Sequence, residues 1–360
     1  MGEAPLPSEH LLVIFNQEIP LHVKEWAQKR FSDIELTLYQ STRGVKTPPE
    51  LYHNATILVT FIDLPEPEDS FNLKIIHTLS AGVDHLLNNP IFKYSEIPFT
   101  TSSGIHGPPI AEWTIMNWLV SARKYSILHE AQKEHKWDKE TPWMETSYDQ
   151  VGQKVGILGY GSIGRQIARV SQALGMTVYA YTASPRPTAE SRHDNGFIVP
   201  GTGDPEGTIP VSWHHGTGKE AIHEFLSLGL DHLVVSVPLT EQTTNLLGAE
   251  EFALLAKHST NPAKKPYVTN ISRGKVINQD DLIEALKSGQ LGGAALDVTN
   301  PEPLPSDHPL WSAPNVQITP HISGSGREYI PRSLEIVRIN IDRTRQGLPL
   351  INAYRRGNGY

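Results

Sequence analysis

Short apolar runs alternate with amphipathic stretches along the first part of this chain. Leu11–Phe15 and Ile57–Thr60 are almost wholly apolar runs of four or five residues, and Glu35–Tyr39 and Ile75–Thr78 are further short stretches with apolar residues. Between the first two runs, Pro20–Arg30 carries apolar residues at helical spacing. Short buried strands that alternate with helices are typical of a parallel sheet covered by helices on both faces. We therefore predict a doubly wound α/β unit in this region.

A glycine-rich stretch follows in the middle of the chain. Val155–Gly164 reads VGILGYGSIG: an apolar strand, a turn, and the start of a helix that we expect to run to Leu174. Gly159, Gly161 and Gly164 fit the pattern G-x-G-x-x-G. The first permits a tight turn, the second lets a pyrophosphate approach the backbone, and the third lets the helix pack on the strand. This context predicts that the turn binds a dinucleotide at a helix N-terminus.

The same alternation continues after the glycine turn, so that six strands are expected in this second unit. The strand of the turn is followed by predicted strands at Met176–Tyr181, Leu233–Val237, Tyr267–Ile271, Gly293–Val298 and Val316–Thr319, and by predicted helices at Lys219–Leu228, Gln279–Ser288 and Arg327–Gln346. The stretch 183–219 is rich in proline and glycine. It is too long for an ordinary connection, which predicts an irregular insertion or a mobile surface loop.

Ile110–Lys124 is the longest apolar run with helical character. Its apolar residues lie on nearly all sides of a helix, so we expect it to be buried in a core, between domains or in a subunit interface. The residues that follow it, 125–150, are polar with interspersed tryptophans.

Composition narrows the class of protein. A chain of 360 residues is expected to form two domains. Its formal net charge of −8 offers no general basic surface for nucleic acid. With no cysteine, it has no disulfide, thiolate metal site or cysteine nucleophile. It also lacks a run of about 18 apolar residues that could span a membrane. We expect a cytoplasmic protein without a nucleic-acid or membrane partner.

Three polar residues stand just after the ends of late predicted strands. They are Arg273 in NISRG, Glu302 in LDVTNPEPLP and His321 in ITPHISGSG. Ligands bind at the carboxyl ends of strands in an open α/β sheet. A guanidinium can clamp a carboxylate, an imidazole can move a proton near neutral pH, and a neighbouring carboxylate can orient that imidazole. Together they predict a catalytic group beside the dinucleotide site.

The order of motifs resembles that of the D-isomer-specific 2-hydroxyacid dehydrogenase family. The resemblance spans roughly residues 75 to 325 and rests on SAGVDHL, IAEWTIMNWLVSAR, GYGSIG, VPLTEQTTNLL, NISRGKVIN, GGAALDVTNPEPLP and NVQITPHISG. It implies an α/β fold in which a Rossmann dinucleotide-binding domain, residues 113–321, is inserted into a smaller flavodoxin-like substrate domain, residues 1–112 and 322–360. It also implies a homodimer formed with the help of Ile110–Lys124.

The resemblance further implies a reaction. A 2-oxo acid would be reduced to the D-2-hydroxy acid by direct hydride transfer from NAD(P)H. Arg273 would hold the carboxylate and the carbonyl of the substrate, and His321 would donate the proton to the carbonyl oxygen. Glu302 would hydrogen-bond to His321 and favour its protonated form. No metal is needed, because Arg273 and His321 already polarise the carbonyl. The expected substrate-binding residues are Ser80, Ala81, Gly82, His106 and Arg273.

The residue after the second strand of a dinucleotide fold discriminates NAD from NADP. NAD-preferring relatives carry Asp where this chain has Thr182, and Ser184 and Arg186 follow. We therefore expect NADP to be preferred over NAD, with these three residues around the 2′-phosphate. Asp297 is expected near the nicotinamide carboxamide. The full set of expected cofactor contacts is Gly159, Tyr160, Gly161, Ser162, Ile163, Gly164, Thr182, Ser184, Arg186, Val237, Pro238, Thr244, Ile271, Ser272, Arg273, Asp297, His321, Ser323 and Gly324.

Two other functions stay open at the level of sequence. Formate oxidation uses the same fold, but that family usually pairs its histidine with Gln, and Glu302 argues against it. An NAD(P)-sensing co-repressor or scaffold would keep the glycine turn and can keep the polar trio. The substrate is also open: Ser80, Ser102 and Ser103 predict a polar pocket suited to glyoxylate or hydroxypyruvate, whereas Trp143 could line a pocket for a bulkier 2-oxo acid.

Overall fold

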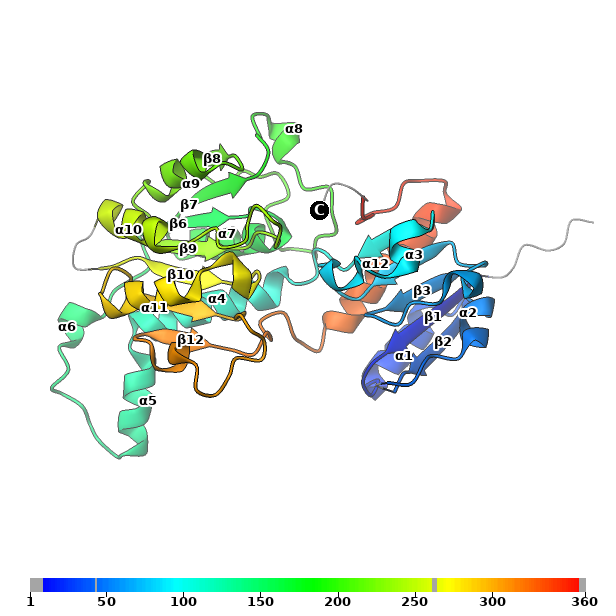
Figure 1. Ribbon diagram of the computed structural model, residues 1–360, viewed down its shortest axis with the longest axis horizontal. Helices are drawn as coiled ribbons and strands as arrows, with labels where there is room; N and C mark the ends of the chain where they lie inside the picture. Colours follow the sequence, from blue (N-terminus) through cyan, green and yellow to red (C-terminus); the bar gives the residue numbers. More distant parts are fainter. Residues whose placement is uncertain (1–8, 43, 261–263, 356–360) are drawn as a thin grey trace, which may run out of the picture. The chain divides into compact units, whose positions relative to one another are not determined.

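The computed structural model describes residues 9–42, 44–260 and 264–355 (Figure 1). The chain forms two compact units. Unit 1 contains the chain up to Ile105, the short segment Asn195–Phe197 and the chain from Gly326 onward, and unit 2 contains His106–Asp194 and Ile198–Ser325. The outermost parts of the predicted split domain, residues 1–8 and 356–360, lie outside the described residues.

Unit 1 is built on a five-stranded parallel sheet with the order β2-β1-β3-β4-β5. This is the flavodoxin-like order. Its strands are β1 (His10–Phe15), β2 (Glu35–Gln40), β3 (Ile57–Thr60), β4 (Ile75–Thr78) and β5 (Phe99–Thr101), and its helices are α1 (Leu21–Arg30), α2 (Pro49–Asn54), α3 (Pro90–Tyr94) and α12 (Tyr329–Arg345).

The central strands β1 and β3 are buried on both faces, which explains why they are apolar runs rather than alternating ones. Leu11 and Val13 of β1 pack with α1 and α12 on one face. Leu12 and Ile14 pack with α2 and α3 on the other face. Helix α12 contributes residues such as Leu334 to the first of these two cores, so the C-terminal part of the chain completes a sheet that begins at the N-terminus.

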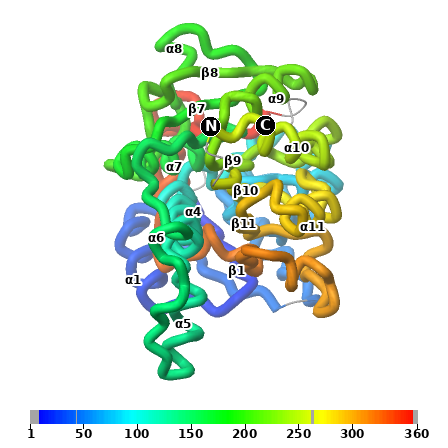
Figure 2. Tube along the Cα trace, turned by 90° about the vertical axis from the view of Figure 1, so that its left-hand side faces the viewer, coloured from blue at the N-terminus to red at the C-terminus, as the bar shows by residue number. Residues whose placement is uncertain are grey.

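Unit 2 is built on a seven-stranded parallel sheet with the order β12-β11-β10-β9-β6-β7-β8. Figure 2 shows α4 and α7 on one face of the sheet and α10 and α11 on the other. The strands are β6 (Lys154–Leu158), β7 (Thr177–Thr182), β8 (Ser212–His215), β9 (His232–Val235), β10 (Tyr267–Asn270), β11 (Gly293–Leu296) and β12 (Val316–Ile318). The helices are α4 (Gly107–Ala122), α5 (Tyr125–Lys133), α6 (Trp143–Thr146), α7 (Ser162–Ala173), α8 (Ala189–Arg192), α9 (Lys219–Leu226), α10 (Ala249–His258) and α11 (Gln279–Lys287).

The predicted α/β class is therefore confirmed, with local corrections. The stretch 183–219 is not wholly irregular, because it holds α8 and β8, and β8 is a seventh strand that the six-strand prediction missed. Unit 2 begins at His106. The reason is that the first turn of α4 packs on α7: a Cβ at Gly107 would lie 3.2 Å from the Cβ of Gln166.

The polar stretch after α4 forms two helices, α5 and α6, neither of which has a buried residue. Figures 1 and 2 both show α5 extending away from the sheet of unit 2. None of the helices formed by the described residues has the length and apolarity needed to cross a bilayer.

Candidate active site

The three glycines of the turn after β6 differ in what surrounds them. Gly159 has φ +101°, and a Cβ there would lie 2.5 Å from the carbonyl oxygen of Ser236. A Cβ at Gly164 would lie 2.7 Å from the carbonyl oxygen of Gly159, so this glycine lets α7 pack closely on the turn. Gly161 faces open space, with nothing within 4 Å of a Cβ position. The turn thus leaves room beside the N-terminus of the 12-residue helix α7, an arrangement that fits a pyrophosphate.

The side chain of Tyr160, inside this turn, is directed into the protein. It is 3% exposed, and its hydroxyl donates to Oδ2 of Asp204 at 2.8 Å. Burial, together with the Asp204 carboxylate, raises the pKa of Tyr160, which keeps the hydroxyl a donor. Asp204 also accepts the backbone N–H groups of Thr208 and Ile209. A cofactor contact by Tyr160 would therefore come from its backbone.

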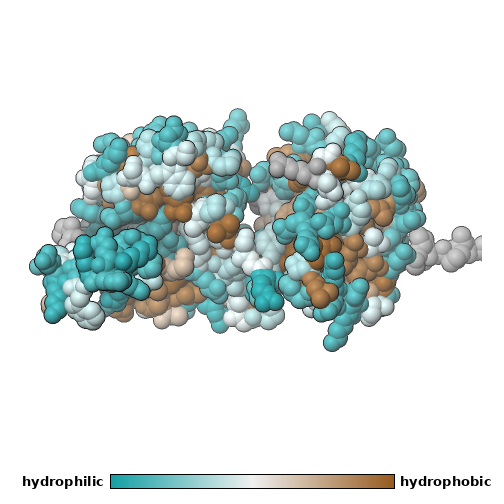
Figure 3. All heavy atoms as spheres, turned by 90° about the horizontal axis from the view of Figure 1, so that it is seen from below, coloured by the Kyte–Doolittle hydropathy of each residue, from teal (hydrophilic) through white to brown (hydrophobic). Residues whose placement is uncertain are grey.

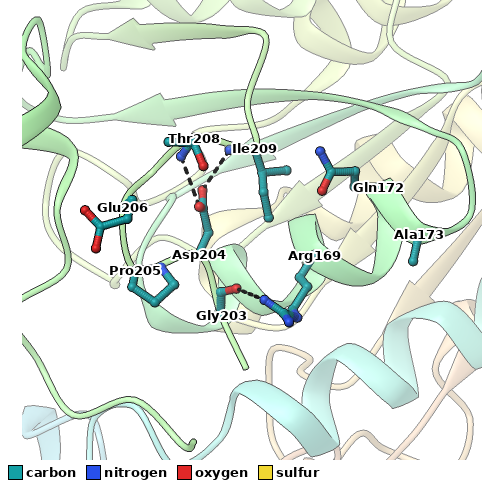
Figure 4. A pocket seen from close by; sticks show the side chains of 9 residues that line it. All are labelled: Arg169, Gln172, Ala173, Gly203, Asp204, Pro205, Glu206, Thr208 and Ile209. Carbon is teal, nitrogen blue, oxygen red and sulfur yellow. Dashed lines mark hydrogen bonds between the residues drawn. The ribbon is translucent and has the colours of Figure 1, made fainter. Parts of the chain in front are cut away.

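Asp204 belongs to the insertion, so the Tyr160 bond ties the insertion to the glycine turn. Arg165 of α7 adds to this anchor. It is 5% exposed, and it donates to the carbonyl oxygens of Asp204 at 2.5 Å and Arg192 at 2.6 Å. Figure 4 shows the neighbouring open pocket of about 610 Å³, where Arg169 of α7 donates to the carbonyl oxygen of Gly203. Asp204 was missed from the sequence, since nothing local to it marks a partner so far along the chain.

The residues expected around a 2′-phosphate begin with Thr182, the last residue of β7, and continue into the loop that follows it. Thr182 Oγ1 donates to the carbonyl oxygen of Ser184 at 2.8 Å, and Arg186 donates to the carbonyl oxygen of Ser191 at 2.7 Å. A second guanidinium, that of Arg192, donates to the carbonyl oxygen of Arg186 at 2.9 Å. Two guanidinium groups therefore follow β7, that of Arg186 in the loop and that of Arg192 at the end of α8, and the sequence indicated only Arg186.

Arg273 stands in a turn organised by Asn270 at the end of β10. The side chain of Asn270 accepts from the N–H and the hydroxyl of Ser272 and donates to the carbonyl oxygen of Arg273 at 3.1 Å. The next residue, Gly274, lies against another loop: a Cβ there would be 2.0 Å from the carbonyl oxygen of Thr299. This close approach brings the segment of Arg273 beside the segment that carries Glu302.

His321 and Glu302 form a hydrogen-bonded pair. Nδ1 of His321 lies 3.1 Å from Oε2 of Glu302, and the side chains are 50% and 39% exposed. Oε1 of Glu302 accepts the backbone N–H of Thr299 at 2.9 Å, which fixes the carboxylate. Because an ionised carboxylate only accepts hydrogen bonds, the imidazole must carry its proton on Nδ1. Nε2 of this half-exposed ring is then the nitrogen able to exchange a proton with a ligand.

Asp297 builds the turn that presents His321. It is 2% exposed, and its two oxygens accept four hydrogen bonds, from Thr319 Oγ1, from the N–H groups of Ile322 and Ser323, and from the Ser323 hydroxyl. His321 itself has φ +55°, and its N–H donates to the carbonyl oxygen of Asp297 at 2.8 Å. A left-handed histidine persists only where its surroundings hold it. This supporting role of Asp297 was not apparent from the sequence.

His106 caps the N-terminal end of α4 and is 9% exposed. A Cβ at Gly324 would lie 3.1 Å from its ring, so His106 stands next to the turn of His321 and Ser323. Trp143 lies on α6, where its indole donates to the carbonyl oxygen of Asp138 at 3.4 Å.

The expected carboxylate-binding residues Ser80, Ala81 and Gly82 follow β4 in unit 1. The Ser80 hydroxyl donates to the carbonyl oxygen of Gly82 at 2.7 Å, which closes this loop on itself. Ser102 does not line a polar pocket as expected. It is fully buried, and its hydroxyl is bonded to the carbonyl oxygen of Thr78 and to Ser333.

A group of side chains with the spacing of metal ligands joins α9 to α10 among the described residues: His223, Glu250 and Glu251. Its charges already have partners. Lys219 pairs with Glu250 at 2.6 Å, and His223 Nε2 lies 2.7 Å from Glu251. We assign no function to this group.

Comparison with known proteins agrees with this geometry. Residues 115–199 and 211–323 match the family model described as "D-isomer specific 2-hydroxyacid dehydrogenase, NAD binding domain". A glyoxylate reductase/hydroxypyruvate reductase from Mus musculus is 33% identical over 255 residues, 71% of this chain and 68% of that protein. The protein of the same name from Homo sapiens is 32% identical over 270 residues, 75% of this chain and 73% of that protein.

Solved structures give the same result over nearly the whole chain. A D-isomer-specific 2-hydroxyacid dehydrogenase family protein from Aeromonas salmonicida has a TM-score of 0.74 at 26% identity and covers 97% of this chain and 99% of its own. An NADPH-dependent glyoxylate/hydroxypyruvate reductase from Sinorhizobium meliloti, in complex with NADP and sulfate, has a TM-score of 0.73 at 27% identity and covers 98% of this chain and all of its own. With its glycine turn, its two parallel sheets and these matches, the chain belongs to the D-isomer-specific 2-hydroxyacid dehydrogenase family and is an NAD(P)-dependent oxidoreductase.

Proposed function

We propose that the protein reduces a small, polar 2-oxo acid such as glyoxylate or hydroxypyruvate, with NADPH preferred over NADH and His321 as the acid. The observation that carries the proposal is the bond between His321 Nδ1 and Glu302, on a left-handed turn held by the buried Asp297. Such a pair leaves Nε2 free to serve as a proton donor or acceptor.

Each residue has a role that follows from its chemistry. The backbone N–H groups of Ala81 and Gly82 bind the substrate carboxylate. Arg273 binds the carboxylate and the carbonyl oxygen, and it stabilises the negative charge that develops on that oxygen. His321 donates its Nε2 proton to this oxygen during reduction and takes it back during oxidation. Glu302 accepts the hydrogen bond from Nδ1 and so orients the imidazole. Bound NADPH supplies the hydride.

The preference for NADPH rests on the loop after β7. No acidic residue stands at the end of β7, where one would bind the ribose hydroxyls, and Arg186 and Arg192 follow in the next segment of the chain. A guanidinium attracts a 2′-phosphate and makes paired hydrogen bonds to it. The Sinorhizobium meliloti relative is NADPH-dependent by name and was crystallised with NADP, which supports the same preference here.

The small substrate is supported by the names of the relatives. The proteins from mouse and human are glyoxylate reductase/hydroxypyruvate reductases. Their names are those of enzymes, which favours turnover over a co-repressor or scaffold role. We include a cytoplasmic location in the proposal, in line with the absence of cysteine from the sequence.

A homodimer formed through the region of α4 and α5 also belongs to the proposal. Met116 and Leu119 of α4 are 50% and 39% exposed, and Ile127 and Leu128 of α5 are 52% and 42% exposed. Figure 3, which views the molecule from the side of α5, shows apolar surface beside a hydrophilic projection of unit 2. Such exposed apolar residues would be covered in a subunit interface. Sedimentation should give a dimer that M116E/L128E converts to a monomer.

The decisive experiment measures turnover with a panel of 2-oxo acids and NADPH. Wild-type protein should consume NADPH with glyoxylate or hydroxypyruvate. His321→Ala should lose about 100-fold or more in kcat, the usual contribution of a general acid, and Arg273→Ala should also raise the KM of the oxo acid. His135→Ala is the matched control, because His135 is an exposed histidine with φ +56° in a turn after α5. Tight NADPH binding with no turnover on any acid would instead favour the sensing role.

A further inference from the structure

The insertion in unit 2 contributes three residues to unit 1. The chain leaves unit 2 after Asp194, places Asn195–Phe197 in unit 1, and returns to unit 2 at Ile198. The last of these residues, Phe197, lies against Gly104, which has φ +95°. A Cβ at Gly104 would be 1.9 Å from the carbonyl oxygen of Phe197, so the two backbones are in direct contact. Gly104 is the residue type that both this φ and this contact require.

One side chain joins the three segments that meet here. Nδ2 of Asn352 donates to the carbonyl oxygens of Thr101 at 3.1 Å and Ser103 at 2.8 Å. Its Oδ1 accepts the backbone N–H of Phe197 at 3.2 Å. The backbone N–H of Thr101 also donates to the carbonyl oxygen of Asn352 at 3.1 Å. Asn352 therefore uses both ends of its amide to fix the segment 195–197 and the loop 101–104 to one another.

The loop 101–104 in turn supports the loop expected to bind substrate. The N–H of Ser102 donates to the carbonyl oxygen of Ser80 at 3.0 Å. The hydroxyl of Ser102 donates to the carbonyl oxygen of Thr78 at 2.9 Å, and Thr78 Oγ1 is bonded to the hydroxyl of Ser80 at 2.8 Å. A displacement of the loop 101–104 would thus be passed to Ser80 and its neighbours Ala81 and Gly82.

We propose that Asn352 and the segment 195–197 are positioning elements for the 2-oxo acid, which hold the loop 80–82 through the loop 101–104. The inference rests on the proposed function in one respect, namely that Ala81 and Gly82 bind the substrate carboxylate. The insertion would then help to bind the substrate, although the strands on either side of it, β7 and β9, belong to the dinucleotide-binding sheet.

Asn352→Gly tests the clamp directly. Asn352 has φ +53°, so glycine removes the side chain without adding backbone strain. The KM for the oxo acid should rise about tenfold, the factor that corresponds to roughly one neutral hydrogen bond, while the KM for NADPH and kcat stay close to the wild-type values. Asn352→Asp, which keeps the acceptor for Phe197 but loses the donors to Thr101 and Ser103, should behave in the same way. Asn315→Gly is the matched control, because Asn315 is exposed, lies in unit 2 and also has φ +53°.

A second pair of variants tests the insertion itself. Phe197→Pro removes the N–H that Asn352 accepts, whereas Phe197→Ala removes the ring and keeps that N–H. A rise in the KM for the oxo acid in Phe197→Pro that exceeds the rise in Phe197→Ala supports the hydrogen bond as the element that acts. Equal values in the two variants would overturn the role of the segment.

Amide hydrogen exchange separates this inference from the proposed function. In Asn352→Gly, the amides of residues 79–86 and 101–104 should exchange faster, and the rest of unit 1 should be unchanged. Wild-type exchange with an unchanged KM would overturn the proposal. A fall in kcat together with an equal rise in both KM values, and faster amide exchange throughout unit 1, would also overturn it. That pattern indicates a merely structural residue. If the wild-type protein reduces no 2-oxo acid, the proposed function fails, and the exchange rates still show whether Asn352 holds the loop 80–82.

Discussion

Asp297→Asn is the substitution that tests most sharply how His321 is held. The buried carboxylate accepts four hydrogen bonds: Oδ1 from Thr319 Oγ1 at 2.6 Å and Ile322 N–H at 2.9 Å, and Oδ2 from the N–H and hydroxyl of Ser323 at 2.9 and 2.5 Å. Asparagine has almost the same shape, but one of its two terminal groups is an amino group that cannot accept. A backbone N–H next to His321 is then left buried without a partner.

The loss of stability in Asp297→Asn can be estimated from these hydrogen bonds. An unsatisfied buried donor costs about 1–3 kcal/mol, and each surviving bond loses roughly 1 kcal/mol when its acceptor is no longer charged. The free energy of unfolding should therefore fall by about 3–5 kcal/mol in unit 2, which lowers Tm by roughly 10 °C for a unit of this size. Since the same turn fixes the left-handed His321, kcat should fall about 100-fold, as expected when a catalytic group is misplaced by about 1 Å.

Two assays measure these effects in one preparation. Thermal unfolding gives Tm, and steady-state reduction of a 2-oxo acid at saturating NADPH gives kcat. Asp280→Asn is the matched control, because Asp280 is exposed in the first turn of α11. The reasoning is refuted if Asp297→Asn has the wild-type Tm and kcat and only its KM for NADPH rises. That result would make Asp297 a cofactor contact rather than the support of the His321 turn.

Three further predictions concern other parts of the chain. Gly274→Ala should lower kcat/KM at least about tenfold, because its methyl group would displace the Thr299 loop and with it Glu302; wild-type kinetics would contradict this. Arg186→Ala should raise the KM for NADPH much more than that for NADH, and equal changes would count against a phosphate contact. Burial lowers the pKa of His77 to about 3, so the unfolded chain binds a proton that the native protein does not between about pH 6.5 and 3. Protonation of His77 in the unfolded chain therefore leaves the free energy of unfolding unchanged above pH 6.5 and lowers it below that pH, by about 2 kcal/mol at pH 5. Urea unfolding of His77→Asn should show a free energy that depends less on pH. The same pH dependence as in the wild type would refute this prediction.

The strands most readily predicted from the sequence are those that are buried on both faces of their sheet. Runs such as Leu11–Phe15 are apolar throughout because both faces of the sheet are covered, and this signal is local. Strand β8 was missed because Ser212–His215 is a half-buried edge strand whose residues, SWHH, show no apolar run. Helix α5 was missed because its apolar residues face solvent, so its pattern does not mark a core.

In the candidate site too, residues with a local signal in the sequence were predicted and residues that act through distant partners were not. Arg273, Glu302 and His321 were predicted because each stands after a strand, where a parallel sheet presents its ligands. Asp204 and Asn352 were not found, because each acts through a partner distant in the sequence: Tyr160 is 44 residues from Asp204, and Thr101 is 251 residues from Asn352. The role of Asp297 lies between these cases, since its motif was recognised but its four donors come from residues 319–323.

The placement of α12 and Asn352 has a consequence for synthesis of the protein on the ribosome. Every residue of unit 2 precedes Gly326, so its sheet can be completed while the last part of the chain is still being translated. Unit 1 begins first and finishes last, because one face of its sheet is covered by α12 and its junction with Phe197 is closed by Asn352. Until α12 has been translated, the apolar face of β1 and β3 has no helix to cover it, which makes the nascent substrate unit the part of this chain that most needs protection from aggregation.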